Sequence, residues 1–209
     1  MEGVKNGPKI IVAQRTLRDV REPNGADDRN LYTIAKLADG KCWMTQSLKL
    51  TGPKTLTTSD SDISANWTLP EPDSVAQGSC VNKTYHAFSG MWIYGYYYNW
   101  YAATAGSGTC TMTSGNATSS ICPKGWHLPD SYGDVFNKYS TPASARAIPA
   151  TFLLSGTPTG EWEQAGYYWT NRANSADIAI YSAITSSAVY PSLADVGKYY
   201  GRNVRCVAR

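Results

Sequence analysis

Residues 31–44, LYTIAKLADGKCWM, carry the clearest local structural signal in this 209-residue chain. Apolar and other residues alternate over 31–37, which is the pattern of a half-buried β-strand. Asp39-Gly40 follows as a turn signal, and a second apolar run begins at Cys42. An Asp-Gly pair between two such runs is typical of a hairpin, because both central residues of a type I′ turn need positive φ. We therefore predict an antiparallel hairpin over 31–44.

The whole chain reads as one domain with an irregular start. Residues 1–30 are expected to form an N-terminal lead-in, in which the apolar run 9–13 has the composition of a short strand. The domain itself is expected over 31–209. Stretches rich in small and polar residues, 51–80 and 105–120, are typical of long loops.

A helix is expected over 132–139, because Asp130 or Ser131 can accept hydrogen bonds from the free amides at its start. Elsewhere the chain is rich in Gly, Ser, Thr and Asn, which suits strands and loops better than a helical bundle. We therefore expect an α+β fold with short antiparallel strands, one or two helices and long loops.

The composition excludes several classes of protein. Aromatic residues make up 12% of the chain and charged residues only 17%, whereas disordered chains are poor in aromatics and rich in charge. The net charge is +3, and the Lys and Arg residues form no cluster, which argues against a nucleic-acid partner. No apolar run is long enough to span a membrane. We expect a folded domain with no nucleic-acid partner and no membrane span.

Motifs for catalysis, metal binding or cofactor binding are missing from the sequence. His86 and His127 lie far from metal-ligand spacing and no C-x-x-C pair occurs, so no metal site is expected. His127 and Asp130 would suit acid–base chemistry, but no nucleophile motif accompanies them, and a polar strand-to-helix junction is favoured. Neither G-x-G-x-x-G nor a Walker loop is present, and no cofactor is expected. The aromatic run 91–101 fits a core better than a ligand platform.

The five cysteines leave two interpretations open. They are Cys42, Cys80, Cys110, Cys122 and Cys206. Two disulfides with one free thiol is one plausible count, and five unpaired thiols is the other.

Five short motifs occur in a fixed order along the chain. They are DGKCWMTQ at 39–46, YYYNWYAA at 96–103, CPKGWHLP at 122–129, GYYW at 166–169 and VRCV at 204–207. This order resembles the Fibrobacter major paralogous domain family over residues 30–209. The resemblance implies a C-type lectin-like fold, in the branch that includes formylglycine-generating enzyme.

The resemblance also implies a function. Many members of this branch look like the variable proteins of diversity-generating retroelements, in which adenine mutagenesis rewrites the 3′ end of the gene. The segment 170–203 lies where the variable region would be. Mutated Asn codons never encode Lys, Gln, Glu, Met or Trp, and Lys198 is the one residue of that set in 170–203. We therefore expect a non-enzymatic display protein that binds a protein or other surface ligand, on a cell or virion surface.

The candidate ligand contacts follow from that variable segment. The polar candidates are Asn171, Arg172, Asn174, Asp177, Ser182, Asp195, Arg202 and Asn203. The apolar and aromatic candidates are Ile178, Ile180, Tyr181, Ile184, Leu193 and Val196. Which of them face solvent stays open, because a shift of one residue along a strand exchanges its two faces.

The resemblance motifs contain Cys122 and Cys206, which implies a disulfide between them. A Cys80–Cys110 pair is the weaker second expectation, and Cys42 would then be free.

Three other functions are weighed against the display protein. A fixed-specificity adhesin without diversification is the main alternative. An enzyme would need reactive cysteines late in the chain, where Cys206 stands alone in an apparent strand. A calcium-dependent lectin lacks its acidic ligand clusters, and Glu22-Pro23-Asn24 fits a turn better than a sugar site.

Overall fold

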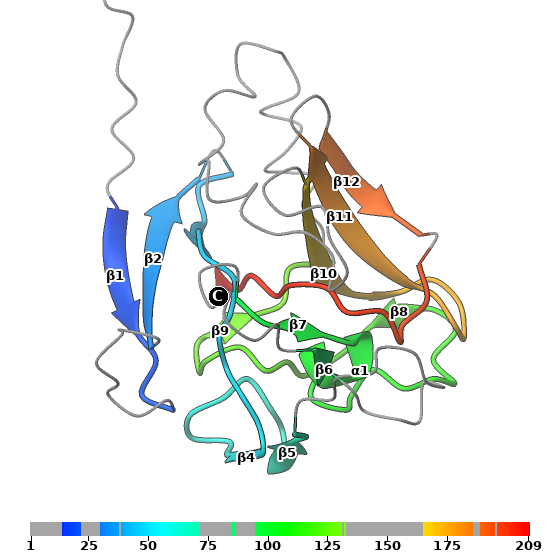
Figure 1. The fold of residues 1–209 in the computed structure, drawn as a ribbon, viewed down its shortest axis with the longest axis horizontal. Coiled ribbons are helices and arrows are strands. Elements are labelled where there is room, and N and C mark those ends of the chain that lie inside the picture. The colour runs from blue at the N-terminus through cyan, green and yellow to red at the C-terminus, as the bar shows by residue number, and fades with distance from the viewer. Residues whose placement is uncertain are drawn as a thin grey trace, which may run out of the picture.

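The computed structural model describes residues 14–21, 30–37, 39–71, 85–86, 95–130, 132, 165–185, 189–194 and 196–209. Within these residues, antiparallel strands form two main sheets and two small two-stranded sheets (Figure 1). The first main sheet has the order β1 (Gln14–Arg18), β2 (Leu31–Lys36), β3 (Cys42–Met44), β13 (Val207–Ala208) and β9 (Trp126–His127). The second has the order β12 (Val189–Leu193), β11 (Ala179–Thr185), β10 (Ala165–Ala173) and β8 (Gly115–Asn116).

Four of the other described strands form two small sheets. One pairs β4 (Lys54–Leu56) with β5 (Trp67–Leu69), and the other pairs β6 (Tyr85–His86) with β7 (Tyr97–Tyr98). The helix α1 (Trp100–Ala103) follows β7 directly. None of the helices in the described part of the chain is long and apolar enough to cross a bilayer.

The predicted hairpin over 31–44 is confirmed. β2 and β3 pair in antiparallel register, with Lys36 opposite Cys42 and Ile34 opposite Met44. The connection is longer than a two-residue type I′ turn: Leu37 N donates to Lys41 O at 3.0 Å. Gly40 alone supplies a positive φ there among the described residues, at 81°. Glycine tolerates that conformation without steric cost, which explains why Asp-Gly marks this turn.

The N-terminal lead-in contributes a strand to the first sheet. β1 pairs with β2 along its whole length, from Gln14 opposite Ala35 to Arg18 opposite Leu31. The strand expected at 9–13 lies outside the described residues. Among the described strands, β1 lies at the edge of its sheet, and the side chains of Arg15 and Arg18 are exposed. Charged side chains on an edge discourage pairing with other chains.

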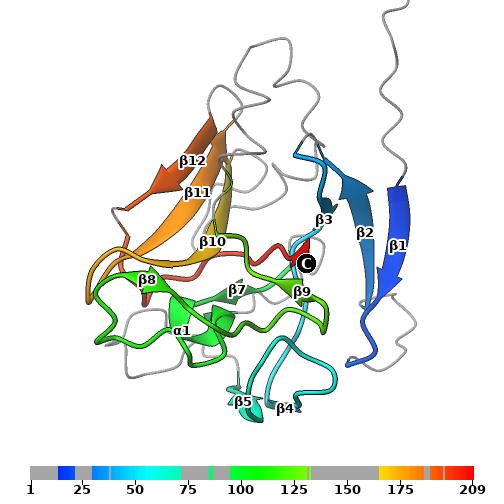
Figure 2. The same cartoon turned by 180° about the vertical axis from the view of Figure 1, so that it is seen from behind.

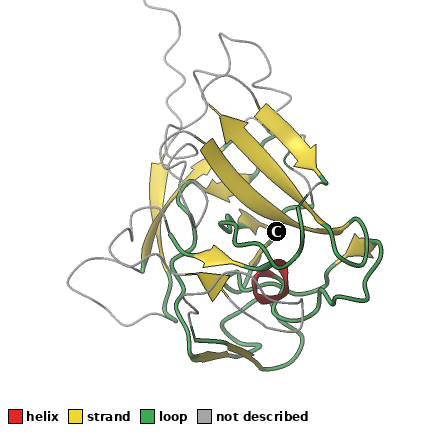
Figure 3. Cartoon of the chain, turned by 45° about the vertical axis from the view of Figure 1, so that its right-hand side comes forward, coloured by secondary structure: helices red, strands yellow, loops and turns green. Residues whose placement is uncertain are grey.

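The predicted α+β class with a C-type lectin fold is wrong, because the described structure is nearly all β (Figure 3). α1 is the one helix in the described ranges, and it has four residues. Asn99 caps its start by accepting from Ala102 N at 2.8 Å, and positive φ values at Ala105 and Gly106 follow its end. The helix expected at 132–139 lies outside the described residues except for Tyr132. Aromatic and β-branched residues favour strands in the segments that are described.

The core between the sheets is aromatic. Its largest fully buried side chains include Trp43, Trp100 and Trp169. In the described part of the aromatic run, Tyr97 and Tyr98 are also buried, while Tyr96 and Tyr101 are half-buried. The C-terminal segment, red in Figures 1 and 2, runs from the second sheet to the first.

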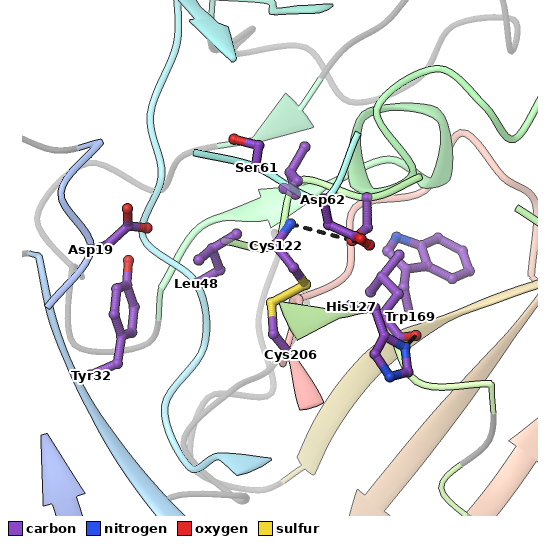
Figure 4. The surroundings of a disulfide bond; sticks show 12 residues. Asp19, Tyr32, Leu48, Ser61, Asp62, Cys122, His127, Trp169 and Cys206 are labelled. Atoms are coloured by element: carbon purple, nitrogen blue, oxygen red, sulfur yellow. Dashed lines mark hydrogen bonds between the residues drawn. A yellow bond between two sulfur atoms is a disulfide. The ribbon is translucent and has the colours of Figure 1, made fainter. Parts of the chain in front are cut away.

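The predicted disulfide between Cys122 and Cys206 is present (Figure 4). Its two Cα atoms are 5.9 Å apart, and the cysteines are separated by 84 positions in the chain. Cys110 is also disulfide-bonded, while its expected partner Cys80 lies outside the described residues. Cys42 is free and exposed.

Candidate functional site

The segment 170–203 covers the end of β10, the turn 174–178, the strands β11 and β12, and the start of the C-terminal segment. It therefore builds most of the second sheet. The segment therefore contains both core and surface positions, and only the surface positions are accessible to a ligand.

Many of the predicted ligand contacts are buried. Ser182 Oγ donates to Pro191 O at 2.6 Å, and Asn203 Nδ2 donates to Tyr96 O at 2.9 Å, so these polar groups serve the fold. A ligand cannot reach the buried side chains in this structure. They are Ile180, Tyr181, Ser182, Ile184, Arg202 and Asn203.

Arg202 illustrates how closely these buried residues pack. Its guanidinium carbon lies 4.8 Å from the ring centroid of Tyr167 and 5.1 Å from that of Tyr181. The residue is only 7% exposed. Cation–π contacts of this kind strengthen when they are removed from water. Arg202 thus holds the C-terminal segment against the second sheet, and its backbone pairs with that of Tyr98.

Four further candidates are half-buried. The Asn171 side chain is hydrogen-bonded within the protein, because its Nδ2 donates to Asp130 Oδ1 at 2.6 Å. The others are Ile178, Leu193 and Val196, of which Leu193 and Val196 pack against the core. Asp195 lies outside the described residues.

His127 and Asp130, the possible acid–base pair, each interact with a different neighbour. His127 Nδ1 lies 2.7 Å from Leu128 O, while Asp130 interacts with Asn171. Figure 4 shows His127 near the Cys122–Cys206 disulfide. Over the described ranges, no three His, Cys, Asp or Glu residues gather into a group that could hold a metal ion.

The exposed candidates are Arg172, Asn174 and Asp177, and they gather at one end of the second sheet. Arg172 is near the end of β10, and the other two belong to the turn that leads into β11. Asn174 N and Ser175 N both donate to Ile178 O, at 2.9 and 3.0 Å, so the backbone of this turn is ordered. An ordered turn presents its side chains at low entropic cost on binding.

Two tyrosines that were not among the candidates extend this exposed end. The rings of Tyr199 and Tyr200 stack with their centroids 4.7 Å apart, and both residues are half-buried. A hydrogen bond with Tyr200 raises the pKa of Tyr199, and the charge of Asp177 acts in the same direction. Two signals in the sequence could have identified these tyrosines. Both lie inside 170–203, and tyrosine is used frequently in binding surfaces.

We call these five residues the rim surface: Arg172, Asn174, Asp177, Tyr199 and Tyr200. It combines a cation, an anion, an amide and two phenol groups, so it can offer hydrogen bonds of both senses and flat aromatic area to a partner. Tyr190, on β12, is 47% exposed and lies outside this definition.

The comparisons with known proteins add no relative: the chain matches no family model, no curated protein and no solved structure.

Proposed function

We propose that this chain is a ligand-binding display protein whose rim surface is diversified by retroelement-driven adenine mutagenesis. Its partner would be a protein or another surface ligand. The chemistry is non-covalent recognition, with the tyrosine rings as anchors and Arg172, Asn174 and Asp177 as directional contacts. The resemblance carried by five ordered motifs motivates the proposal. The proposed function does not depend on a lectin fold.

One observation supports the proposal most directly: the segment 170–203 contains both a buried framework and a rim whose residues are exposed or, at Tyr199 and Tyr200, half-buried. Buried positions such as Ile184 are 2% exposed, and Asn203 is fully buried, while Arg172, Asn174 and Asp177 are exposed. Exposed positions away from special features accept substitutions at a cost of about 0.5 kcal/mol or less. A diversified surface needs this division, because variation at the exposed positions Arg172, Asn174 and Asp177 then leaves the fold intact.

The disulfide supports an external location. Cys122 and Cys206 form a buried bridge, and such bridges persist in oxidising surroundings. A cell surface or a virion surface provides those surroundings, and a display protein has to be exposed in the same place.

Sequencing this gene across a natural population tests the proposal without knowledge of the ligand. We expect substitutions at adenines of a template repeat, concentrated in the codons for Arg172, Asn174, Asp177, Tyr199 and Tyr200. The codons for Ile184 and Asn203 are matched controls from the same segment, because their side chains are buried.

Two results would contradict diversification. One is a uniform rim, and the other is variation spread over all bases and the whole gene. Either would leave a fixed-specificity adhesin as the better function, because the exposed rim chemistry would still be available to one constant partner.

A further inference from the structure

The described part of the chain contains two copies of the acceptor motif for asparagine-linked glycosylation. This motif is N-x-[S/T], in which the middle residue is not proline. It occurs at 66–68 as Asn-Trp-Thr and at 116–118 as Asn-Ala-Thr, and a third copy at 82–84 lies outside the described residues. A glycan is bulky and hydrophilic, so the asparagine that carries it has to face solvent in the folded protein. The structure shows whether the two described copies meet this requirement.

The motif at 116–118 faces solvent at both of its defining residues. Asn116 and Thr118 are exposed, whereas Ala117 between them is only 8% exposed. The Ala117 amide donates to Asn171 O at 2.8 Å, which holds the middle of the motif against β10. The backbone is therefore fixed, and the asparagine and the threonine point away from the protein.

The motif at 66–68 has the same alternation. Asn66 directly precedes β5, and both Asn66 and Thr68 are exposed. Trp67 between them is half-buried, and its ring centroid lies 6.3 Å from that of Tyr101. β5 pairs with β4, with Trp67 opposite Leu56, so this copy also has an ordered backbone and an outward asparagine.

The other described asparagines differ from these two. Asn30, Asn99 and Asn203 are buried, and Asn171 is half-buried. Asn174 is exposed, but Ser-Ala follows it, and none of these five residues begins an acceptor motif. Asn174 is therefore a natural internal control, because it is accessible and lacks the motif.

The disulfide supports the location that this modification needs. Cys122 and Cys206 form a bridge, and bridges persist in oxidising surroundings outside the cytosol. Asparagine-linked glycans belong to surface loops of secreted proteins. Export of the chain would satisfy both conditions.

We propose that Asn66 and Asn116 are N-glycosylation sites. The co-substrate is a lipid-linked oligosaccharide, and an oligosaccharyltransferase of the producing cell catalyses the transfer. The amide nitrogen Nδ2 attacks the anomeric carbon of the first sugar, so that an N–C bond forms and the C–O bond to the lipid diphosphate breaks. The lipid diphosphate leaves with the electron pair, the amide releases one proton, and no group is oxidised or reduced.

The glycan on Asn116 would border the rim surface. β8 is the outermost described strand of the second sheet, and Asn116 lies opposite Arg172 of β10. A glycan there would also cover the outer edge of β8, and covered edges do not pair with other chains. Figures 1 and 2 show β5, which follows Asn66, at the lower end of the molecule away from β8. The two glycans would therefore lie on separate parts of the surface.

Mass spectrometry of the full-length protein isolated from its own source tests the two sites. We expect peptides with a saccharide mass that fragmentation assigns to Asn66 and to Asn116. The peptide that contains Asn174 should have its unmodified mass. Unmodified Asn66 and Asn116 would overturn the proposal, and a saccharide on one of them alone would overturn the assignment of the other.

Variants secreted from yeast test whether the motif directs the modification. Thr118→Val removes the hydroxyl group, and we expect it to abolish the saccharide at Asn116 and leave that at Asn66 in place. Thr118→Ser is the matched control, because it preserves the motif and should preserve the glycan. Thr118 is exposed, so both variants should fold. Asn116→Gln removes the same site if Thr118→Val is not secreted.

Two results with the yeast proteins would overturn the assignment. One is a secreted wild-type chain in which both asparagines are unmodified, and the other is equal occupancy of Asn116 in Thr118→Val and the wild type. These outcomes are independent of the display function, because both motifs lie outside 170–203 and population sequences of the rim do not affect them.

Discussion

Trp100 and Trp169 donate hydrogen bonds reciprocally into each other's segment. The indole N–H of Trp100 donates to Thr170 O at 2.9 Å, next to Trp169 in β10. The indole N–H of Trp169 donates to Tyr98 O at 2.7 Å, two residues before Trp100. Both side chains are fully buried. The pair therefore ties helix α1 to the strand from which the rim surface begins.

Replacing one of these indoles should be costly. We expect Trp169→Phe to lower the free energy of unfolding by about 2–4 kcal/mol, because it removes a buried hydrogen bond and leaves a cavity. Urea denaturation followed by circular dichroism measures this loss. Trp67→Phe is the control, since Trp67 is only partly buried, and we expect it to cost less than about 1 kcal/mol. Equal losses in the two variants would contradict the importance of the reciprocal pair.

Removing the Cys122–Cys206 disulfide should destabilise the domain strongly. The bridge spans 84 positions, and closing a loop of that length is worth on the order of 4–5 kcal/mol in the chain-entropy account. The double variant Cys122→Ala with Cys206→Ala removes the bridge without leaving a buried thiol. Cys42→Ser, at the free and exposed cysteine, should change stability by less than about 0.5 kcal/mol. A double variant as stable as Cys42→Ser would show that the bridge adds nothing.

Rim and framework positions should respond differently to truncation. We expect Arg172→Ala and Asn174→Ala to change the free energy of unfolding by about 0.5 kcal/mol or less, because both residues are exposed. Ile184→Ala, from the same segment, should cost about 2–5 kcal/mol, because its side chain is buried. Thermal and urea unfolding of the three variants measure these changes. A large loss of unfolding free energy at either exposed position would contradict the expectation that the rim tolerates substitution.

Stability should fall in acid through Asp60. Burial raises the pKa of this carboxyl, but hydrogen bonds from Ser61 and Thr57 and the charge of Arg21 outweigh it, so the pKa lies below its usual value. A carboxyl with a lowered folded-state pKa stabilises the fold above the unfolded value of about 4 and loses that effect as pH falls through the folded one. We expect Asp60→Asn to make the decline of stability below about pH 4 shallower. Parallel acid unfolding curves for variant and wild type would contradict this.

Local chemistry in the sequence was sufficient for some features. The hairpin over 31–44 follows from alternation and from the Asp-Gly turn, because both act over a few neighbouring residues. Its connection is longer than expected, since Leu37 and Lys41 close the loop by a backbone hydrogen bond. The Cys122–Cys206 bridge was expected from the motifs that contain the two cysteines, and the structure confirms it.

At the candidate site, sequence patterns do not predict which residues are buried. Ile178 and Ile180 alternate as if one face of a strand were exposed, yet β11 is buried at nearly every position from Ala179 onward. Periodicity identifies a strand but does not reveal whether a second layer covers its other face.

Amino-acid order alone indicated an aromatic-rich folded chain and predicted a hairpin, and the resemblance of ordered motifs implied one disulfide pair, because these depend on composition, neighbouring residues or motifs. Tertiary structure was needed to show that strands dominate the fold, that Arg202 is enclosed by tyrosine rings, and that Lys198 meets carbonyl groups 86 and 89 positions away. Burial and long-range hydrogen bonding arise from segments distant in the chain. Local sequence does not encode which of those segments become neighbours.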